Sequence, residues 1–266
     1  PTNHHLSQIL ERWTLNGAYV HRSGLSVEAG LFGGTEPEGP YDFSNLESFG
    51  DSWSVRVARR FGEGFGPGAA WEVSGSYGRV GHEDHPATHL LNAAIRHDGG
   101  HGFGRLYVLV EASRSDPGGA EEGFYSILGE ARFELGPTGR HQPYVRLEYA
   151  TRPEFERLGP PGTDDFFRYD HHDESTDRAT RWSIVSLGYG VDLTGLPVSL
   201  RPFVEVQHHR VWAERGGVEP ELLFGAHEFW GLTTGLRVFL GGGPMRMGSY
   251  GVLDPMSGAM AGAGRT

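Results

Sequence analysis

The sequence predicts an all-β fold, an antiparallel up-and-down transmembrane β-barrel of about twelve strands. Three observations predict it: apolar and polar residues alternate along much of the chain, each alternating stretch is about ten residues long, and turn-forming residues separate the stretches. Alternation with period two is typical of β-strands, because successive side chains leave opposite faces of the sheet. Strands of soluble sandwiches have about five or six residues, whereas a strand tilted across a bilayer needs about nine to eleven. The long repeats therefore favour a barrel that spans a membrane.

The alternation is clearest in residues 181–193, where Val185 and Leu187 point to one face and Ser186 and Gly188 to the other. Ten other stretches show the same pattern and end at Gly, Pro, Asp or Asn. The predicted strands are 12–22, 24–33, 51–61, 69–80, 87–97, 103–114, 122–135, 141–152, 180–193, 198–212 and 228–240.

The connections between these strands alternate in length. Short turns fall at 22–24, 62–68, 98–100, 136–139 and 194–197. Longer polar connections fall at 34–50, 81–86, 115–121, 153–179 and 213–227. Barrels of the bacterial outer membrane have short periplasmic turns and longer extracellular loops. We therefore expect the long connections outside the cell, and the turns at Ser23, Thr138 and Gly195 in the periplasm.

Composition agrees with a barrel and excludes several other classes. Hydrophobic residues make up 37% of the 266 residues and the mean hydropathy is -0.41, so no stretch reaches the roughly 18 apolar residues of a membrane helix. A net charge of -11 argues against nucleic acid as a partner. The absence of Cys excludes a disulfide scaffold and a thiolate metal site. The chain opens at Pro1 without a signal peptide, so we expect a removed export signal or a piece of a longer chain.

In the predicted strands, polar residues mostly occupy every second position, and these positions share one face, which we expect to point inward. In 51–61, for example, Val55 and Val57 alternate with Arg56 and Arg60. An Arg facing hydrocarbon at the bilayer midplane costs about two to four kcal/mol, so these charges are expected to line water or one another. Two interpretations stay open: a salt-bridged wall, or a hydrated pore whose charges tune solute passage. The predicted lumen-lining residues are Glu28, Arg56, Arg60, Glu72, Arg105, Glu111, Glu130, Arg132, Glu134, Arg146, Glu148, Arg201 and Glu205.

Aromatic residues near the strand ends predict girdles at the membrane surfaces, where a ring can be half wet. They are Trp53, Trp71, Tyr77, Tyr149, Trp182, Trp212 and Trp230.

The odd number of predicted strands needs an explanation, because single-chain bacterial barrels have an even number. A further strand is expected within 34–50, after Gly241, or before Pro1, and the last of these is favoured.

Five segments resemble a family of uncharacterised, porin-like outer-membrane β-barrel proteins of Gram-negative bacteria. They are PTNHHLS at 1–7, the strand pair in 13–32, GGTEP at 33–37, DSWSVR at 51–56 and WEVSGSYG at 71–78. The resemblance covers most of the N-terminal half and implies several strands before the His-His loop, which would restore an even count. It implies no particular reaction. The chain departs from common barrels at its end, where Phe239-Leu240 runs into a tail instead of closing on an aromatic residue.

Two loops combine histidine with carboxylates, a set of ligands that suits zinc, nickel or copper. The candidate ligands are His82, His85, His171 and His172. The favoured interpretation is a solvated polar loop, with an Asp/His hydrolytic pair at Asp170, His171 and Asp173 as a remote alternative. The adjacent His208 and His209 face opposite ways in a strand, so they cannot bind one ion together.

All four methionines fall in the last 22 residues, and Met245, Met247 and Met256 could gather Cu(I) through their thioethers. The favoured interpretation is a Gly-rich disordered tail in which Met is incidental.

These observations divide the chain into a lead segment 1–10, a transmembrane barrel 11–240 and a Gly/Met-rich tail 241–266. The leading function is a porin-like passive channel for small solutes or ions in the bacterial outer membrane. The first alternative is a structural or binding barrel that displays polar loops or holds a protein partner or a second copy. A copper-related protein or a barrel hydrolase comes third. We expect membrane lipid and small solutes as partners, no enzyme activity, and no cofactor beyond a weak copper or zinc site.

Overall fold

The computed structural model describes residues 13–34, 46, 48–62, 70–81, 86–101, 104–118, 123–136, 139–153, 179–193, 199–216 and 219–239. These residues form eleven strands and one short helix. The strands are β1 (Thr14–Val20), β2 (Leu25–Gly33), β3 (Phe49–Phe61), β4 (Ala70–Val80), β5 (Thr88–His101), β6 (Gly104–Pro117), β7 (Phe124–Leu135), β8 (His141–Pro153), β9 (Ala179–Val191), β10 (Ser199–Arg215) and β11 (Glu228–Phe239), and the helix is α1 (Pro220–Phe224). Each of the eleven predicted strands is confirmed. The lead segment and the tail lie outside the described residues.

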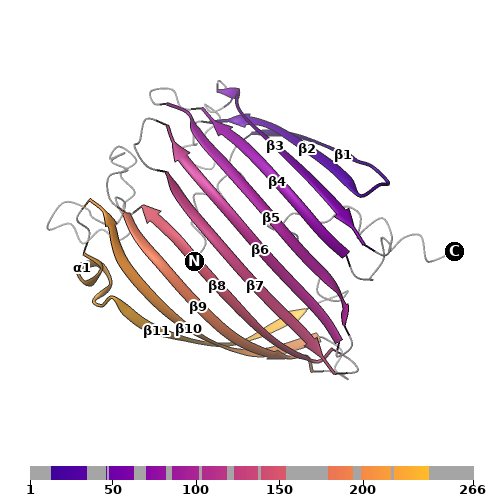
Figure 1. Ribbon diagram of the computed structural model, residues 1–266, viewed down its shortest axis with the longest axis vertical. Helices are drawn as coiled ribbons and strands as arrows, with labels where there is room; N and C mark the ends of the chain where they lie inside the picture. The colour runs from indigo at the N-terminus through magenta and orange to yellow at the C-terminus, as the bar shows by residue number, and fades with distance from the viewer. Residues whose placement is uncertain are drawn as a thin grey trace.

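All eleven strands belong to one antiparallel sheet, in which every strand pairs with its neighbours in the sequence. Figure 1 shows them side by side in chain order, crossing the molecule diagonally. The up-and-down topology is therefore confirmed. Every strand from β3 to β11 has at least eleven residues, which is as long as a tilted bilayer-spanning strand needs to be.

The connections alternate in length less regularly than the sequence indicates. Those at 34–48, 154–178 and 216–227 are clearly the longest, and all three lie at the same end of the sheet. The other connections do not alternate consistently in length, and 62–69, predicted as a short turn, is one residue longer than 81–87. We call the end with the three longest connections the long-connection end, and the opposite one the short-turn end.

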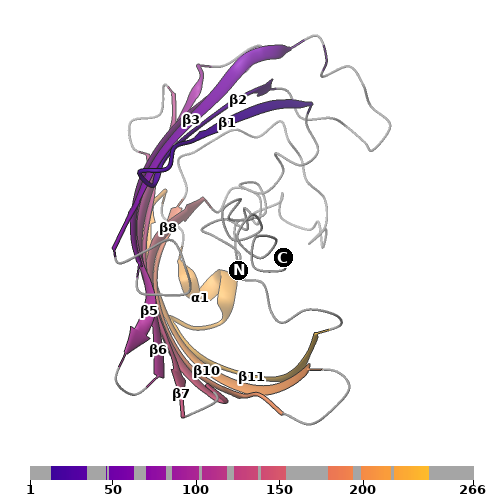
Figure 2. The same ribbon diagram turned by 90° about the vertical axis from the view of Figure 1, so that its right-hand side faces the viewer.

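The sheet is strongly curved but is not closed within the described residues. Its strand order starts at β1 and ends at β11, with eleven strands instead of about twelve. Figure 2 shows the sheet as an arc that is open between β1 and β11. Because the number of strands is odd, β1 and β11 run in the same direction, so direct pairing between them would be parallel. Closure into a barrel stays a prediction.

The two faces of the sheet differ sharply, as predicted from parity. Residues that pair across neighbouring strands share a face, and one row can be followed through nine strands. This row is Arg60, Glu72, Arg96, Leu109, Glu130, Arg146, Ser186, Gln207 and Gly231. Trp182 is on the same face as Ser186 and contacts Phe224 of α1, and α1 lies on the concave side (Figure 2). The polar row therefore lies on the concave face.

The best-buried apolar cluster lies on this concave face, at the long-connection end. Trp182, Ile184 and Val211 form it, and Phe224 and Phe229 pack against it. The Trp182 ring meets Phe224 edge to face at 4.9 Å between centroids, a favourable aromatic geometry. Trp182 was predicted for an outer aromatic girdle, and that prediction is wrong: the residue has inward parity and only 5% of its surface is exposed. Among the described residues, no helix is long and apolar enough to span a membrane.

Candidate functional site: the charged concave face

The structure places all thirteen predicted lumen-lining residues on the concave face. Their pairings show this directly, since Glu28 pairs with Arg56, Arg105 with Glu134, and Glu205 with Gly188 beside Tyr144. Alternate residues of a strand share a face, so the remaining predicted residues lie on the concave face as well. The thirteen side chains therefore project into the space that the arc encloses.

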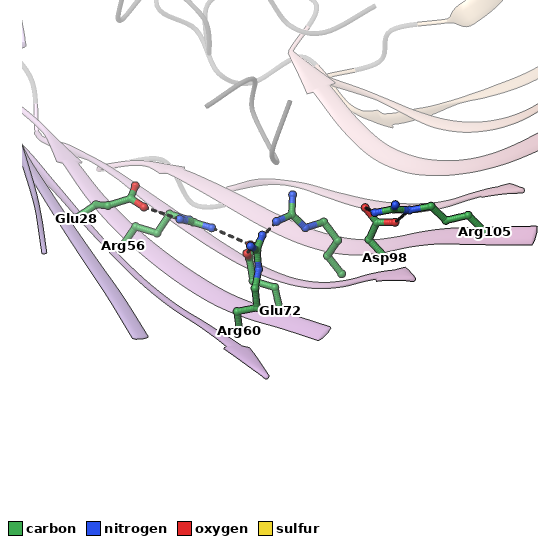
Figure 3. A network of polar contacts seen from close by, with 7 residues as sticks. Glu28, Arg56, Arg60, Glu72, Asp98 and Arg105 are labelled. Carbon is green, nitrogen blue, oxygen red and sulfur yellow. Dashed lines mark hydrogen bonds and ion pairs between the residues drawn. The ribbon is translucent and has the colours of Figure 1, made fainter. Parts of the chain in front are cut away.

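Glu72 on β4 is the centre of the largest charge network (Figure 3). Its Oε1 lies 3.3 Å from Arg56 Nη2, and its Oε2 lies 3.5 Å from Arg60 Nη2 and 2.8 Å from Arg96 Nη2. Arg56 continues the network to Glu28, with 2.7 Å between Nη1 and Oε1. Three guanidinium groups thus share the carboxylate of Glu72.

A second pair follows along the same face toward the short-turn end. Arg105 donates two hydrogen bonds to Asp98, from Nε at 2.7 Å and from Nη2 at 3.0 Å. Figure 3 shows this two-pronged contact beside the Glu72 network. The flat guanidinium matches the two carboxylate oxygens, so the pair holds β5 and β6 in register near their turn.

Further pairs extend the pattern across β7 and β8. Arg132 lies 3.3 Å from Glu134, and Arg146 Nε lies 2.8 Å from Glu148. These side chains are between 23% and 41% exposed, so solvent screens each pair and its contribution to stability is about 1 kcal/mol or less. The charges therefore form a hydrated surface more than a stabilising core.

Tyr144 on β8 organises the polar contacts toward β10. Its hydroxyl donates a 2.5 Å hydrogen bond to Glu205, which also accepts one from Gln207 Nε2 at 3.0 Å. The Tyr144 ring occupies the space above Gly188 of the intervening strand β9, where any Cβ would overlap it. Glycine at this position is what allows one side chain to reach across two strand spacings.

The short-turn end of β9 and β10 carries an ion pair whose arginine is buried. Arg201 donates to Asp192 from Nε at 2.6 Å and from Nη2 at 3.1 Å, and Gln142 donates to the same carboxylate at 2.7 Å. Arg201 is 6% exposed. A charge so well shielded needs such partners, since an unpaired buried guanidinium is strongly destabilising.

Five polar residues of this face are not among the predicted lumen-lining residues. Alternation in 87–97 already puts Arg96 on the polar parity, so that signal was present. The sequence Asp98-Gly99-Gly100 predicts a turn, yet β5 continues to His101. The other three gain their roles only from packing across strands, which parity does not reveal. The five residues are Arg96, Asp98, Tyr144, Asp192 and Gln207.

The candidate metal ligands cannot be placed. His82, His85, His171, His172, Met245, Met247 and Met256 all lie outside the described residues. Within the part of the chain that is described, no three His, Asp or Glu side chains are grouped to hold a metal ion. His208 and His209 do face opposite sides: His208 stacks on Trp230 on the convex face, and His209 stacks on Phe229 on the concave face.

The convex face is apolar and exposed across the whole sheet. Its aliphatic side chains form a band along the middle of the strands. Exposed members on seven different strands are Val57 (46%), Leu91 (51%), Val110 (46%), Ile127 (50%), Leu147 (53%), Leu187 (58%) and Leu232 (70%). Soluble monomers rarely expose contiguous apolar patches beyond a few hundred Å², so this face requires a cover.

Aromatic residues frame this aliphatic band at both ends of the strands. At the long-connection end, Trp53 packs on Tyr77, whose hydroxyl lies 2.6 Å from His89 Nδ1. At the short-turn end, Trp71 stacks on His97 at 4.6 Å between ring centroids, and the Tyr189 hydroxyl lies 2.5 Å from His141 Nδ1. Each belt thus combines rings with polar groups at the same depth.

Comparison with protein-family models, with curated proteins and with solved structures found no match to this chain.

Proposed function

We propose that this chain is a porin-like passive channel for small solutes or ions in a bacterial outer membrane. The observation that carries the proposal is the division of one curved sheet into an exposed apolar convex face and a charged concave face. A soluble β-protein buries its apolar face and exposes its polar one, and here the arrangement is reversed.

The convex face supports the membrane part of the proposal. An aliphatic band between two aromatic belts matches the outer surface of a transmembrane barrel, where the rings lie at the two interfaces. Long strands support it further, because they exceed what a soluble sandwich uses. Lipid would supply the cover that the exposed aliphatic side chains lack.

The concave face supports the channel part. Its charges are paired but still reach solvent, as Arg56 and Glu28 do at 28% and 30% exposure. Closure of the sheet would enclose these groups around water. Charged groups that line a pore set which ions pass, so this face would select solutes by charge and size without chemistry.

Reconstitution of the full chain in a planar bilayer tests the proposal. We expect discrete conductance steps with an ohmic current–voltage relation. The Glu72→Gln variant should shift the reversal potential in a salt gradient toward anion selectivity, because Arg56, Arg60 and Arg96 lose their shared carboxylate.

The matched control is Glu228→Gln. Glu228 also pairs with an arginine, Arg210 at 3.1 Å, but on the convex face. The Glu228→Gln variant loses the same charge but keeps the concave network intact. The reversal potential of this variant should therefore match that of the unmodified protein. Absence of conductance, or equal shifts in the two variants, would contradict the proposal.

A binding barrel is the second candidate, and α1 is the observation that favours it. This helix lies inside the curve of the sheet (Figure 2) and is anchored there by Phe224 on Trp182. An inward segment narrows the enclosed space. A conductance below that of an ion-sized pore, together with a normally folded protein, would favour binding over transport.

A further inference from the structure

The two rims of the sheet differ in charge. The sequence has 23 basic and 34 acidic residues, and every basic residue is an arginine. Nineteen of the acidic residues fall within the predicted long connections, against four arginines. The short turns contain two acidic residues, Glu63 and Asp98, and Asp98 is paired on the concave face. The long-connection rim is therefore acidic, and the short-turn rim is not.

On the convex face, the arginines of the long-connection rim have acidic or carbonyl partners. Arg114 lies 3.1 Å from Asp116, Arg210 lies 3.1 Å from Glu228, and Arg181 pairs with Glu214. Arg79 donates to the backbone carbonyl of Asp51 at 2.7 Å. These arginines are already neutralised or occupied.

The short-turn rim also has exposed arginines, and Arg140 among them donates to the backbone carbonyl of Asp192 at 3.2 Å. Arg22 lies in the turn between β1 and β2, Arg59 lies on the convex face of β3, and Arg140 precedes β8. The acidic residues described at this rim are Asp98, Glu134 and Asp192, and their partners are Arg105, Arg132 and Arg201 on the concave face. Among the described residues, none of the three rim arginines has an ion pair.

Arg22 and Arg59 come from adjoining parts of the sheet, the β1–β2 turn and β3. Arg59 pairs with Leu25, three residues beyond Arg22, and the turn is fixed to β3 by the bond from Arg60 N to the Gly24 carbonyl at 2.8 Å. Beside them, Phe61 pairs with Trp71, which stacks on His97. We call this set (Arg22, Arg59, Phe61, Trp71 and His97) the short-turn patch. It combines two guanidinium groups with a platform of rings.

We infer that the short-turn patch binds the phosphate-bearing headgroups of anionic phospholipids. A guanidinium recognises phosphate oxygens through paired N–H donors, and aromatic rings lie at the depth of the headgroups. Toward the middle of the strands, Val57 and Val73 provide an apolar surface for an acyl chain. The inference rests on the proposed membrane location, and it assigns the short-turn rim to the leaflet that contains such lipids.

Native mass spectrometry of the full chain in neutral detergent micelles tests it, with short-chain phosphatidylglycerol and phosphatidylcholine as probes. The unmodified protein should bind phosphatidylglycerol more tightly. The double variant Arg22→Gln/Arg59→Gln should bind phosphatidylglycerol roughly 30-fold more weakly. This figure takes about 1 kcal/mol for each arginine and a tenfold change in affinity for about 1.4 kcal/mol. Affinity for phosphatidylcholine should stay the same.

The control is Arg114→Gln/Arg210→Gln, which removes the same charge from the opposite rim and should leave the lipid preference intact. Equal losses in both double variants, or no preference in the unmodified protein, would overturn the inference. Inorganic phosphate is the third probe, and competition by it at lipid-like concentrations would show an anion site instead of a lipid site. The lipid experiment measures binding and the bilayer experiment measures conductance, so the two proposals can fail separately. Lipid preference without conductance would contradict only the proposed channel, and conductance without lipid preference would contradict only this inference.

Discussion

Tyr144 and Gly188 show how a single residue shapes the concave face. The ring of Tyr144 lies on Gly188, and its hydroxyl reaches Glu205 on the next strand. Phe203 covers Gly235 in the same way, one strand pair further along. Aromatic cover of a strand glycine restores packing that the missing side chain would have supplied. In both contacts a large ring occupies the space that a side chain at the glycine would need.

We expect Gly188→Ala to lower the free energy of unfolding by about 1–3 kcal/mol, because the new methyl group displaces the Tyr144 ring and strains the bond to Glu205. The shift in the urea midpoint, followed by tryptophan fluorescence, measures it. Gly129→Ala is the control, since a Cβ there meets no atom within 4 Å. A Gly188→Ala protein as stable as the control would show that the ring is not held there.

The alternation of apolar and polar residues assigned the predicted charged residues to one face of the sheet, but it could not identify which side chains they contact. All thirteen predicted charged positions lie on one face, because a period of two leaves no choice once a strand is established. Trp182 failed because the interpretation as a girdle residue rested on its residue type and its place near a strand end, although its parity pointed inward. The contact that buries it comes from Phe224, thirteen residues beyond Val211 in a different element. Such contacts are long-range and leave no local signal.

At the scale of elements, α1 depends on what it packs against. A helix of five residues is not stable by itself. Pro220 begins it and is fully buried, Gly225 ends it at a φ of 76°, and the Val211 amide donates to the His227 carbonyl at 2.9 Å. The helix is therefore held at both ends and by the Phe224 ring.

We expect Phe224→Ala to release α1 from the sheet, because the substitution removes the ring that contacts Trp182 and Phe229. Cleavage after Glu221 by a glutamate-specific protease should become at least tenfold faster in the folded protein. Leu222→Ala on the same helix should change the rate less than twofold, since Leu222 is 85% exposed. Similar rates in the two variants would mean that Phe224 does not anchor the helix.

The strands were predictable as elements, and the helix was not. Strand ends shifted by a few residues, most at β5, β6 and β10, which run on to His101, Pro117 and Arg215. Gly99-Gly100 indicated a turn, but a strand can pass through glycines when its neighbours hold it by backbone hydrogen bonds. Residues 213–227 were expected as an outer loop, and this segment contains a helix that folds toward the concave side (Figure 2).

At the scale of the whole molecule, the direction of the edge strands limits how the sheet can close. β1 and β11 run the same way, so antiparallel closure requires an odd number of further strands between them. One such strand would separate β1 from β11 by two strand spacings, about 10 Å. That exceeds the Cα separation of about 7 Å beyond which a disulfide cannot form.

Cysteine pairs measure this gap cleanly, because the chain has no cysteine of its own. Leu15→Cys combined in turn with Trp230→Cys, Leu232→Cys or Thr234→Cys should form no disulfide on oxidation, and should be joined by a bismaleimide that spans about 10 Å. Leu15→Cys with Leu31→Cys is the positive control, since these residues face each other on β1 and β2. A disulfide between β1 and β11 would show direct parallel closure instead.

The chain-order arrangement of the sheet also has a consequence for folding kinetics. Each strand pairs with the strands that precede and follow it in the sequence. The sheet can therefore form one hairpin at a time, without pairing segments that are far apart in the chain. Contacts this local in sequence favour rapid folding. The entropic cost of closing a loop rises with the logarithm of its length. The connection 154–178 should therefore be the slowest to close. Assembly should therefore pause between β8 and β9, with the first eight strands formed and the last three still to be added.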